Sequence, residues 1–113
     1  MMLRSNVIQA KRTTVDGITF DSQKEANRYL VLKRMEKEGV ISDLKLQPEY
    51  LLLPKQVDVN GRCLERSLSY RADFSYTRDG ETIVEDVKGF KFPEYRIKRK
   101  LMLYFHNIRV HET

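Results

Sequence analysis

The sequence is poor in cysteine, proline and glycine, and it contains no tryptophan. Its one cysteine, Cys63, excludes an internal disulfide framework and a cysteine-rich zinc site, because each of these needs several cysteines. No apolar run approaches the ~20 residues that a membrane-spanning helix requires. Residues 1–12 have neither the apolar stretch nor the cleavage site of a signal peptide. We therefore expect a cytoplasmic protein rather than a secreted or membrane-bound one.

Charge is what the sequence has in excess. Lys and Arg number 21 against 16 Asp and Glu among 113 residues, which gives a net charge of +5. Charged residues make up 33% of the chain, above the roughly 25% of an average protein. The 41% of hydrophobic residues argues against disorder. The length favours a single domain over residues 1–113, and the basic charge favours an anionic partner.

Two segments are predicted to be helical. Residues 22–38 are rich in strong helix formers, and the Gly39 that follows is typical of a helix end. Pro93 suits the first turn of a second helix that runs to about His106. One face of the first helix carries Glu25, Ala26, Tyr29, Leu32, Met35 and Glu36, and the apolar face predicted for the second carries Ile97, Leu101, Tyr104 and Phe105.

The remaining segments read as strands. Asp-Gly or Asn-Gly pairs at 16–17, 60–61 and 79–80 predict tight hairpins, because type I′ turns need two positive φ angles. Strands are predicted at 43–53 with a bend at Pro48, at 68–77, at 81–88 and at 108–111, and a hairpin extension is predicted at 55–66. The expected fold is therefore α/β with an αβββαβ core, in which helices flank a mixed central sheet and β-hairpins extend from it.

The hairpin at 79–80 groups three charged side chains. A two-residue turn pairs Arg78 with Glu81, and the same register places Asp73 opposite Asp86. Opposite residues point to one face with Cβ atoms ~4.5–5.5 Å apart, and Lys88 shares that face with Asp86. Two carboxylates so placed suit a hard cation such as Mg²⁺. The alternative is an exposed, charged hairpin face on which Lys88 forms a salt bridge with one aspartate.

The residues around these acids carry a resemblance. Residues 70–74 (YRADF) and 84–89 (VEDVKG) resemble the PD-(D/E)XK phosphodiesterase superfamily, with Ala72 where the superfamily name has proline. The resemblance implies a restriction-endonuclease-like fold and a Mg²⁺-dependent DNA endonuclease in which Mn²⁺ can substitute. It also implies that Asp73, Asp86 and the Val87 carbonyl bind the metal, with Lys88 beside the attacking water.

A closer likeness extends over most of the chain. Residues 15–25, 46–48, 70–74, 85–90 and 95–100 look like a family of small phage and prophage proteins known as a domain of unknown function. Small phage enzymes of the superfamily include resolvases, similar to Holliday junction resolvases, that cut branched DNA as dimers. The likeness therefore implies a phage product in the bacterial cytoplasm, with branched DNA as substrate and a homodimer as assembly.

Two further acids compete for a place in this site. The superfamily pattern adds an acid from the first helix, and Glu25 matches it. A capping box in which Glu25 bonds back to Ser22 is the alternative for that residue. Glu85 is the rival of Asp86, but alternation along the strand places Glu85 with residues 70, 72 and 74, away from Asp73. We therefore prefer Asp86.

The segment after Lys88 is strongly basic. Its residues predicted to bind DNA phosphates are Lys91, Arg96, Arg99 and Lys100, and the alternative is an ordinary solvated face. Phe92 and Tyr95 are able either to stack on bases or to pack against the sheet. Gln47, before Pro48, is placed near the metal and the DNA by the resemblance, with a strand-end hydrogen bond as the alternative.

Two other functions stay open on the sequence alone. One is a nucleic-acid-binding module without catalysis, for which DNA binding would need no divalent ion. The other is a structural or interaction protein of a phage, which would not bind DNA at all. An intact Asp73, Asp86 and Lys88 set favours the nuclease, because a pure binding protein has no need of acids facing a phosphate.

Overall fold

The computed structural model describes residues 11–87 and 92–113, and its central element is a four-stranded sheet. The strands are β3 (Ser42–Leu46), β8 (Phe74–Arg78), β9 (Glu81–Asp86) and β10 (His111–Glu112), in the order β10-β9-β8-β3. β3, β8 and β9 are antiparallel neighbours, whereas β10 runs parallel to β9. The prediction of a mixed central sheet is confirmed.

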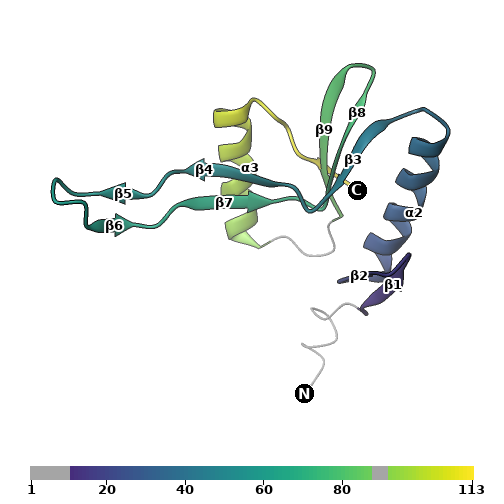
Figure 1. Ribbon diagram of the computed structural model, residues 1–113, viewed down its shortest axis with the longest axis horizontal. Coiled ribbons are helices and arrows are strands. Elements are labelled where there is room, and N and C mark those ends of the chain that lie inside the picture. The colour runs from purple at the N-terminus through teal and green to yellow at the C-terminus, as the bar shows by residue number, and fades with distance from the viewer. Residues whose placement is uncertain (1–10, 88–91) are drawn as a thin grey trace.

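Two helices lie on opposite sides of this sheet, α2 (Gln23–Lys37) and α3 (Pro93–His106) (Figure 1). Successive side chains of a strand point to opposite faces, so each helix has its own core. Phe74 and Tyr76 pack with the buried residues of α2, whereas Val84 packs with those of α3. In the described part of the chain, neither helix has the length and apolar character needed to cross a membrane.

The first helix forms as predicted. Ser22 is its N-cap, and the Ser22 Oγ accepts a hydrogen bond of 3.0 Å from the N–H of Glu25. The helix ends at Lys37, and Gly39 follows with a φ of +81°, which a residue without a side chain adopts at little cost. The buried residues of the helix are Glu25, Ala26, Tyr29 and Leu32, all from the predicted face.

The bounds predicted for the second helix are confirmed, but its predicted apolar face is only partly right: Leu101 packs against the core under α3, whereas the other three residues are largely exposed. Ile97, Tyr104 and Phe105 are 58%, 80% and 49% exposed, and the buried residues are Tyr95 and Met102. These two residues are seven positions apart and therefore lie on one face after two turns. Polar bonding helps to set this rotation, because the Tyr95 hydroxyl donates to the Glu112 carboxylate over 2.7 Å.

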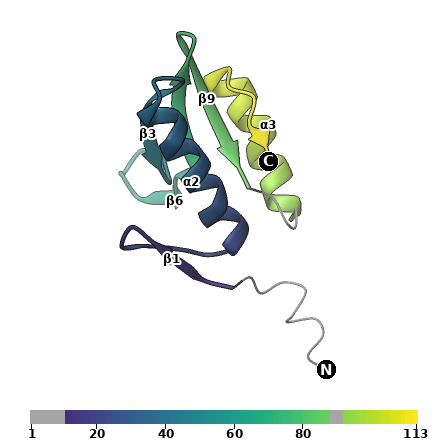
Figure 2. The same cartoon turned by 90° about the vertical axis from the view of Figure 1, so that its right-hand side faces the viewer.

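A long ribbon arm leaves the sheet between β3 and β8 (Figure 1). Its near part pairs β4 (Glu49–Leu53) with β7 (Leu68–Arg71) and packs on α3, and its far part pairs β5 (Gln56–Val57) with β6 (Cys63–Glu65). A second hairpin, β1 (Thr13–Val15) with β2 (Ile18–Phe20), lies against the start of α2 (Figure 2). The predicted hairpin extensions are thus confirmed, but the two-residue type I′ turn expected at 60–61 is not, because only Gly61 of that pair has a positive φ.

The strand predicted at 68–77 is broken at Ala72 and Asp73, level with the predicted bend at Gln47 and Pro48. The Gln47 N–H donates to the Asp73 carbonyl over 2.9 Å, and the Ala72 N–H donates to the Pro48 carbonyl over 3.0 Å. The paired breaks turn the ribbon. As a result, Tyr70 packs in the core under α3 while Phe74 packs in the core under α2.

The hairpin register is confirmed, whereas the last strand is displaced. β8 and β9 pair from Arg78 opposite Glu81 to Phe74 opposite Glu85. The final strand, predicted at 108–111, instead forms at His111–Glu112. α3 ends at His106, its C-cap Asn107 has a left-handed φ of 56°, and Val110 is buried in the core under α3. The segment between α3 and β10 therefore packs on this core before β10 pairs with β9.

The packing of α2 gives a direct stability test. Leu32 is fully buried, whereas Leu30, on the same helix, is 44% exposed. Leu32→Ala is expected to lower the free energy of unfolding in urea by about 2–4 kcal/mol, because it removes buried methyl groups and leaves a cavity. Leu30→Ala is the matched control and should cost less than about 1 kcal/mol. Equal losses would contradict the assignment of this core.

Candidate active site

Asp73 and Asp86 lie in contact just beyond the last residue pair of the β8–β9 ladder. The N–H of Asp73 donates to Oδ1 of Asp86 over 2.7 Å, and the N–H of Val87 donates to Oδ2 of Asp73 over 2.7 Å. Each carboxylate therefore binds the backbone of the opposite strand. The register set by the turn at 79–80 brings these two aspartates together, as expected from the sequence.

Asp86 is held from several directions and is only 2% exposed. Its Oδ2 accepts a hydrogen bond from the Tyr70 hydroxyl, and its carbonyl accepts one of 2.9 Å from the N–H of Thr113. Burial, followed by the hydrogen bond to Asp86, raises the pKa of Tyr70. The Tyr70 hydroxyl therefore stays protonated and remains a donor. The break between β7 and β8 places Tyr70 on the α3 side of the sheet. The same break therefore brings the Tyr70 hydroxyl to Asp86.

Gln47 lies beside the pair through its backbone. Its N–H bonds to the Asp73 carbonyl, and its own φ of 51° lies in the left-handed region. The Gln47 side chain is exposed. The strand-end hydrogen bond considered from the sequence is therefore present, and a role of the Gln47 side chain toward DNA stays a prediction.

Glu85 occupies the other face of β9, where it forms a buried ion pair. Arg28 of α2 binds it at both oxygens, with Nε–Oε1 at 2.6 Å and Nη2–Oε2 at 2.9 Å. The Tyr76 hydroxyl donates to Oε2 over 2.7 Å. Burial and the bond to Glu85 raise the pKa of Tyr76 to about 12. Glu85 is thus committed to holding α2 against the sheet.

The preference for Asp86 over Glu85 agrees with these contacts, but part of its reasoning was wrong. Glu85 was expected to share a face with Tyr70, Ala72 and Phe74. It pairs with Phe74 across the ladder, whereas Tyr70 and Ala72 lie in the core under α3. The break at Asp73 is the reason, because simple alternation does not continue across a strand break.

Glu25 is buried on the inner face of α2, at 7% exposure. Its N–H donates to Ser22, which is one half of the expected capping box. Within residues 11–87 and 92–113, no three His, Cys, Asp or Glu side chains come close enough to bind one metal ion. Glu25 is therefore not grouped with Asp73 and Asp86 in this conformation. Its role toward a metal stays a prediction.

The predicted donors fit a hard divalent cation in kind. Mg²⁺ typically takes one or two carboxylates and completes its shell with water and phosphate oxygens. Asp73 and Asp86 supply two carboxylates from residues that are joined by the bond of the Asp73 N–H to Asp86, and the Val87 carbonyl was predicted as a third oxygen. Lys88 and Lys91, predicted beside the attacking water and on the DNA, lie outside the described residues.

Glu112 is an acid near the site that the sequence did not reveal. In the parallel pairing of β10 with β9 it stands next to Asp86. Its Oε2 accepts hydrogen bonds from the Tyr95 hydroxyl over 2.7 Å and from Arg99 Nη1 over 2.9 Å. Burial and the bond to Glu112 raise the pKa of Tyr95. Val110 and Glu112 are two positions apart, so a strand through both would place them on the same face. The predicted strand ended at His111 and did not include Glu112.

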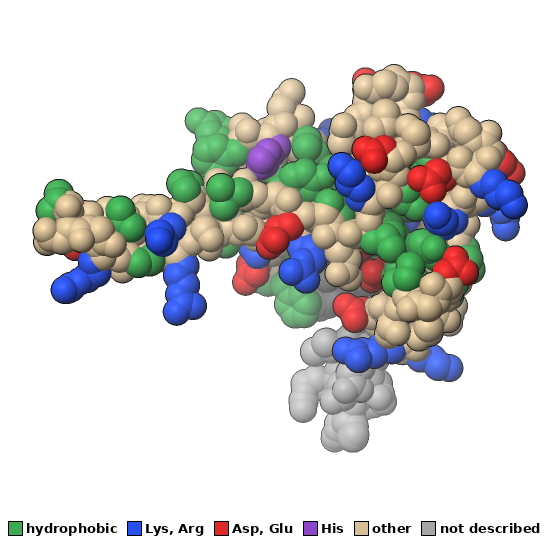
Figure 3. Space-filling view, in the orientation of Figure 1, with side chains coloured by type: hydrophobic (Ala, Val, Ile, Leu, Met, Phe, Trp, Pro, Cys, Tyr) green, Lys and Arg blue, Asp and Glu red, His purple; other side chains and the backbone are tan. Residues whose placement is uncertain are grey.

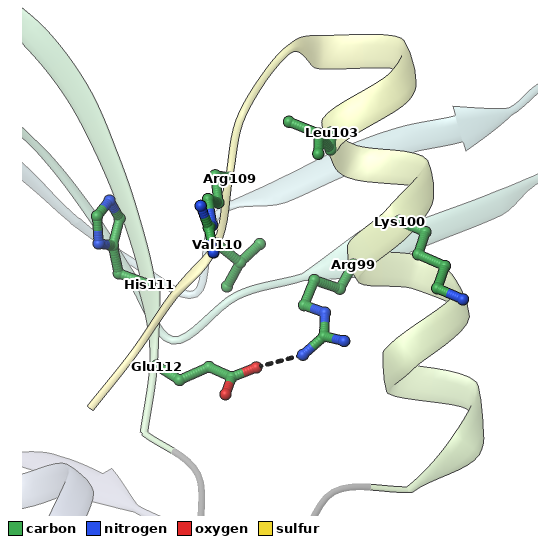
Figure 4. A pocket seen from close by; sticks show the side chains of 7 residues that line it. All are labelled: Arg99, Lys100, Leu103, Arg109, Val110, His111 and Glu112. Atoms are coloured by element: carbon green, nitrogen blue, oxygen red, sulfur yellow. Dashed lines mark hydrogen bonds and ion pairs between the residues drawn. The ribbon is translucent and has the colours of Figure 1, made fainter.

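The basic residues of α3 fall into two groups. Arg96 and Lys100 are exposed, as a phosphate-binding role requires. Arg99 is bound to Glu112, and its guanidinium lies 5.7 Å from the centre of the Tyr95 ring. Arg99 and Lys100 line a cavity of about 640 Å³ together with Leu103, Arg109, Val110, His111 and Glu112 (Figure 4). Arg99 therefore has a structural partner that the prediction did not include.

The ribbon arm adds basic charge away from this helix. Lys and Arg side chains project along the arm, separate from the acids near the sheet (Figure 3). Residues 54–67 contain three exposed bases, Lys55, Arg62 and Arg66, against two acids, Asp58 and Glu65. The Asp58 carboxylate is partly used within the turn, where it accepts hydrogen bonds from two backbone N–H groups. Basic surface is thus present on both α3 and the arm.

The fold and site define a mixed α/β domain in which two aspartates meet at the ends of adjoining strands. The chain belongs to the family described as a protein of unknown function (DUF1064), whose model matches residues 5–112. This confirms the likeness to a family of unknown function over nearly the whole chain. No curated protein and no solved structure matched the chain.

A substitution of Arg28 tests the structural role of Glu85, the acid of β9 that is not assigned to the metal. Arg28→Ala leaves the Glu85 carboxylate, with 1% of its side chain exposed, without its cation. We expect a loss of about 3 kcal/mol in the free energy of unfolding, because an unpaired buried charge is strongly unfavourable. Arg34→Ala, an exposed change on the same helix, is the control and should stay within about 0.5 kcal/mol of the parent. Similar small losses in both would contradict a stabilising role for the Arg28–Glu85 pair.

Proposed function

We propose that this protein is a metal-dependent endonuclease that hydrolyses phosphodiester bonds of DNA, with Mg²⁺ as cofactor and Mn²⁺ as a substitute. The observation that carries the proposal is the contact between Asp73 and Asp86. This contact places two aspartate side chains at one point of the sheet, and carboxylates are the ligands that a hard divalent cation such as Mg²⁺ takes. Such an ion also has a use toward phosphate, because it polarises the phosphoryl group.

The element order supports the same proposal. The core runs α2-β3-β8-β9-α3-β10, with the ribbon arm inserted between β3 and β8. This is the αβββαβ order of the restriction-endonuclease-like core, and Asp73 and Asp86 fall at its second and third strands. The finer fold assignment, membership of the PD-(D/E)XK superfamily, is therefore part of the proposal.

Each group has a definite task in this proposal. A bound Mg²⁺ would polarise the phosphate and lower the pKa of a bound water. Asp73 and Asp86 would hold the ion, and Tyr70 fixes the position of the Asp86 carboxylate by donating to it. Lys88 would orient the water and stabilise the charge that develops on the phosphate. Exposed Arg96 and Lys100 would bind neighbouring phosphates of the backbone.

The choice of branched DNA, the homodimer and the phage origin rest on the resemblance alone. By this resemblance to small phage enzymes, the proposed substrate is branched DNA, the proposed assembly is a homodimer and the proposed source is a phage. The basic arm and the basic helix α3 are compatible with contacts to more than one DNA segment.

A second candidate is a nucleic-acid-binding module without catalysis. The burial of Asp86 favours it, because the carboxylate accepts hydrogen bonds from Asp73 and Tyr70 at its two oxygens. A carboxylate bound in this way also serves to fix the break between β7 and β8. Under this candidate the protein binds DNA equally well with and without a divalent ion.

Cleavage of supercoiled, linear and four-way-junction DNA with Mg²⁺ or Mn²⁺ tests the proposal. Asp86→Asn and Lys88→Ala are each expected to lower the cleavage rate by at least about 100-fold, since the metal and its charge partner supply several kcal/mol of transition-state stabilisation. Glu81→Gln, exposed at the other end of the same hairpin, is the matched control and should cut like the parent.

Thermal unfolding of each variant checks that the fold is kept. Cleavage by folded Asp86→Asn and Lys88→Ala at the parental rate would overturn the assignment of these residues. Binding to DNA without cleavage under any of these conditions would instead favour the binding module.

A further inference from the structure

A cavity of about 600 Å³ lies next to Asp86, between β7, the end of β9 and the first turn of α3. Tyr70, Tyr95 and Asp86 line it from the inside, and Phe92 and Pro93 line it from the start of the helix. We call it the aromatic pocket, after Tyr70, Phe92 and Tyr95. It opens beside the carboxylate to which the proposed function assigns the metal.

The two tyrosine rings of the pocket are fixed in place. The Tyr70 hydroxyl donates to Asp86, and the Tyr95 hydroxyl donates to Glu112 over 2.7 Å. The ring centres lie 6.3 Å apart, so each ring also supports the other. A ligand that enters the pocket therefore meets a preformed surface, which reduces the entropy cost of binding.

Phe92 is the accessible aromatic residue of the pocket, at 50% exposure. It occupies the N-cap of α3, where Ser, Thr, Asp and Asn are preferred, and it makes no side-chain capping bond. Helix capping therefore does not account for a phenylalanine at this position. A large apolar ring kept at the mouth of a pocket is well placed to contact a ligand.

The pocket combines an accessible aromatic ring with two basic side chains, Arg71 and Lys98, and two acidic ones, Asp86 and Glu94, and the aromatic lining favours a ligand with a flat apolar part. Arg71 is exposed at the end of β7, and Lys98 reaches the pocket from α3, where its Nζ lies 3.3 Å from Glu94 Oε2. A nucleotide combines an aromatic base with a phosphate, and bases stack on aromatic side chains whatever their sequence. A base paired within a duplex does not present its face, so a base in the pocket has to be unpaired.

We propose that the aromatic pocket binds an unpaired nucleobase of the DNA strand, next to the phosphate that lies at Asp73 and Asp86. The inference rests on the proposed function and gives it a substrate class: DNA with unpaired nucleotides, as at a branch point or a single-stranded end. Phe92 stacks on the base, and Arg71 and Lys98 face the adjoining backbone. Continuous duplex lacks the group that fills the pocket.

Binding without a divalent ion tests this independently of cleavage. The probes are a fluorescein-labelled duplex with one unpaired 2-aminopurine and the fully paired duplex of the same sequence, both in EDTA. The parent protein should bind the first probe more tightly and quench its 2-aminopurine fluorescence through stacking. Phe92→Ala should weaken binding of the unpaired probe about 5-fold to 100-fold and abolish the quenching, with little change for the paired duplex.

Phe105→Ala is the matched control, because Phe105 lies at the other end of α3 with a similar exposure of 49%. It should leave both affinities unchanged. Phe92→Trp should quench the 2-aminopurine as the parent does, because a tryptophan ring also stacks on a base. A merely structural role of Phe92 would not require this result. Equal binding of the two probes by the parent, or an equal loss for both in Phe92→Ala, would overturn the inference.

The outcomes also separate this inference from the proposed function. Selective binding of the unpaired probe without any cleavage in Mn²⁺ would support the pocket and contradict the nuclease. Cleavage of DNA without selective binding would support the nuclease and contradict the pocket.

Discussion

The hydrogen bonds from the Asp73 N–H to Asp86 and from the Val87 N–H to Asp73 are the interactions on which the rest of this structure depends. They form where the β8–β9 ladder ends, and they clamp the point at which the ribbon turns from the sheet into the arm. The turn moves Tyr70 to the α3 side, where its hydroxyl fixes Asp86. The same turn opens the aromatic pocket between β7 and α3. Asp73 and Asp86 therefore both stabilise the turn of the ribbon and form the candidate site. Substitutions at these two residues test the proposed function.

Adjacent acids of β9 have opposite tasks because they point to opposite faces. Glu85 is neutralised by Arg28 and holds α2, so its charge is fully used within the fold. Asp86 is held by a backbone N–H and a hydroxyl, which are neutral donors. Glu85 is therefore engaged on the α2 side of the sheet, whereas Asp86 lies beside Asp73 at the end of the hairpin. This position beside a second aspartate is the physical reason for preferring Asp86 as a metal ligand.

Local signals in the sequence predicted much of the fold. Ser22, Gly39 and the Asp-Gly turn at 79–80 determine where α2 begins and ends and how β8 pairs with β9, and each acts within a few residues. The break at Ala72 and Asp73 was missed because neither residue is a strand breaker and the bonds that hold it come from Gln47 and Pro48. The predicted apolar face of α3 was only partly right because Tyr95 and Met102 are selected by distant partners. The proximity of the two aspartates was predictable from the turn, whereas the Tyr70 donor required the tertiary structure and Glu112 lay one residue past the end of the predicted strand.

A crystal of the full chain soaked in Mn²⁺ is the most direct test of the central claim, because the anomalous signal of manganese locates the ion without any assumption about activity. The account predicts an ion in contact with carboxylate oxygens of both Asp73 and Asp86, at roughly the 2.0–2.1 Å typical of small divalent cations. A soaked crystal in which Asp86 remains bound to Tyr70 and Asp73, with no ion at either aspartate, would contradict it.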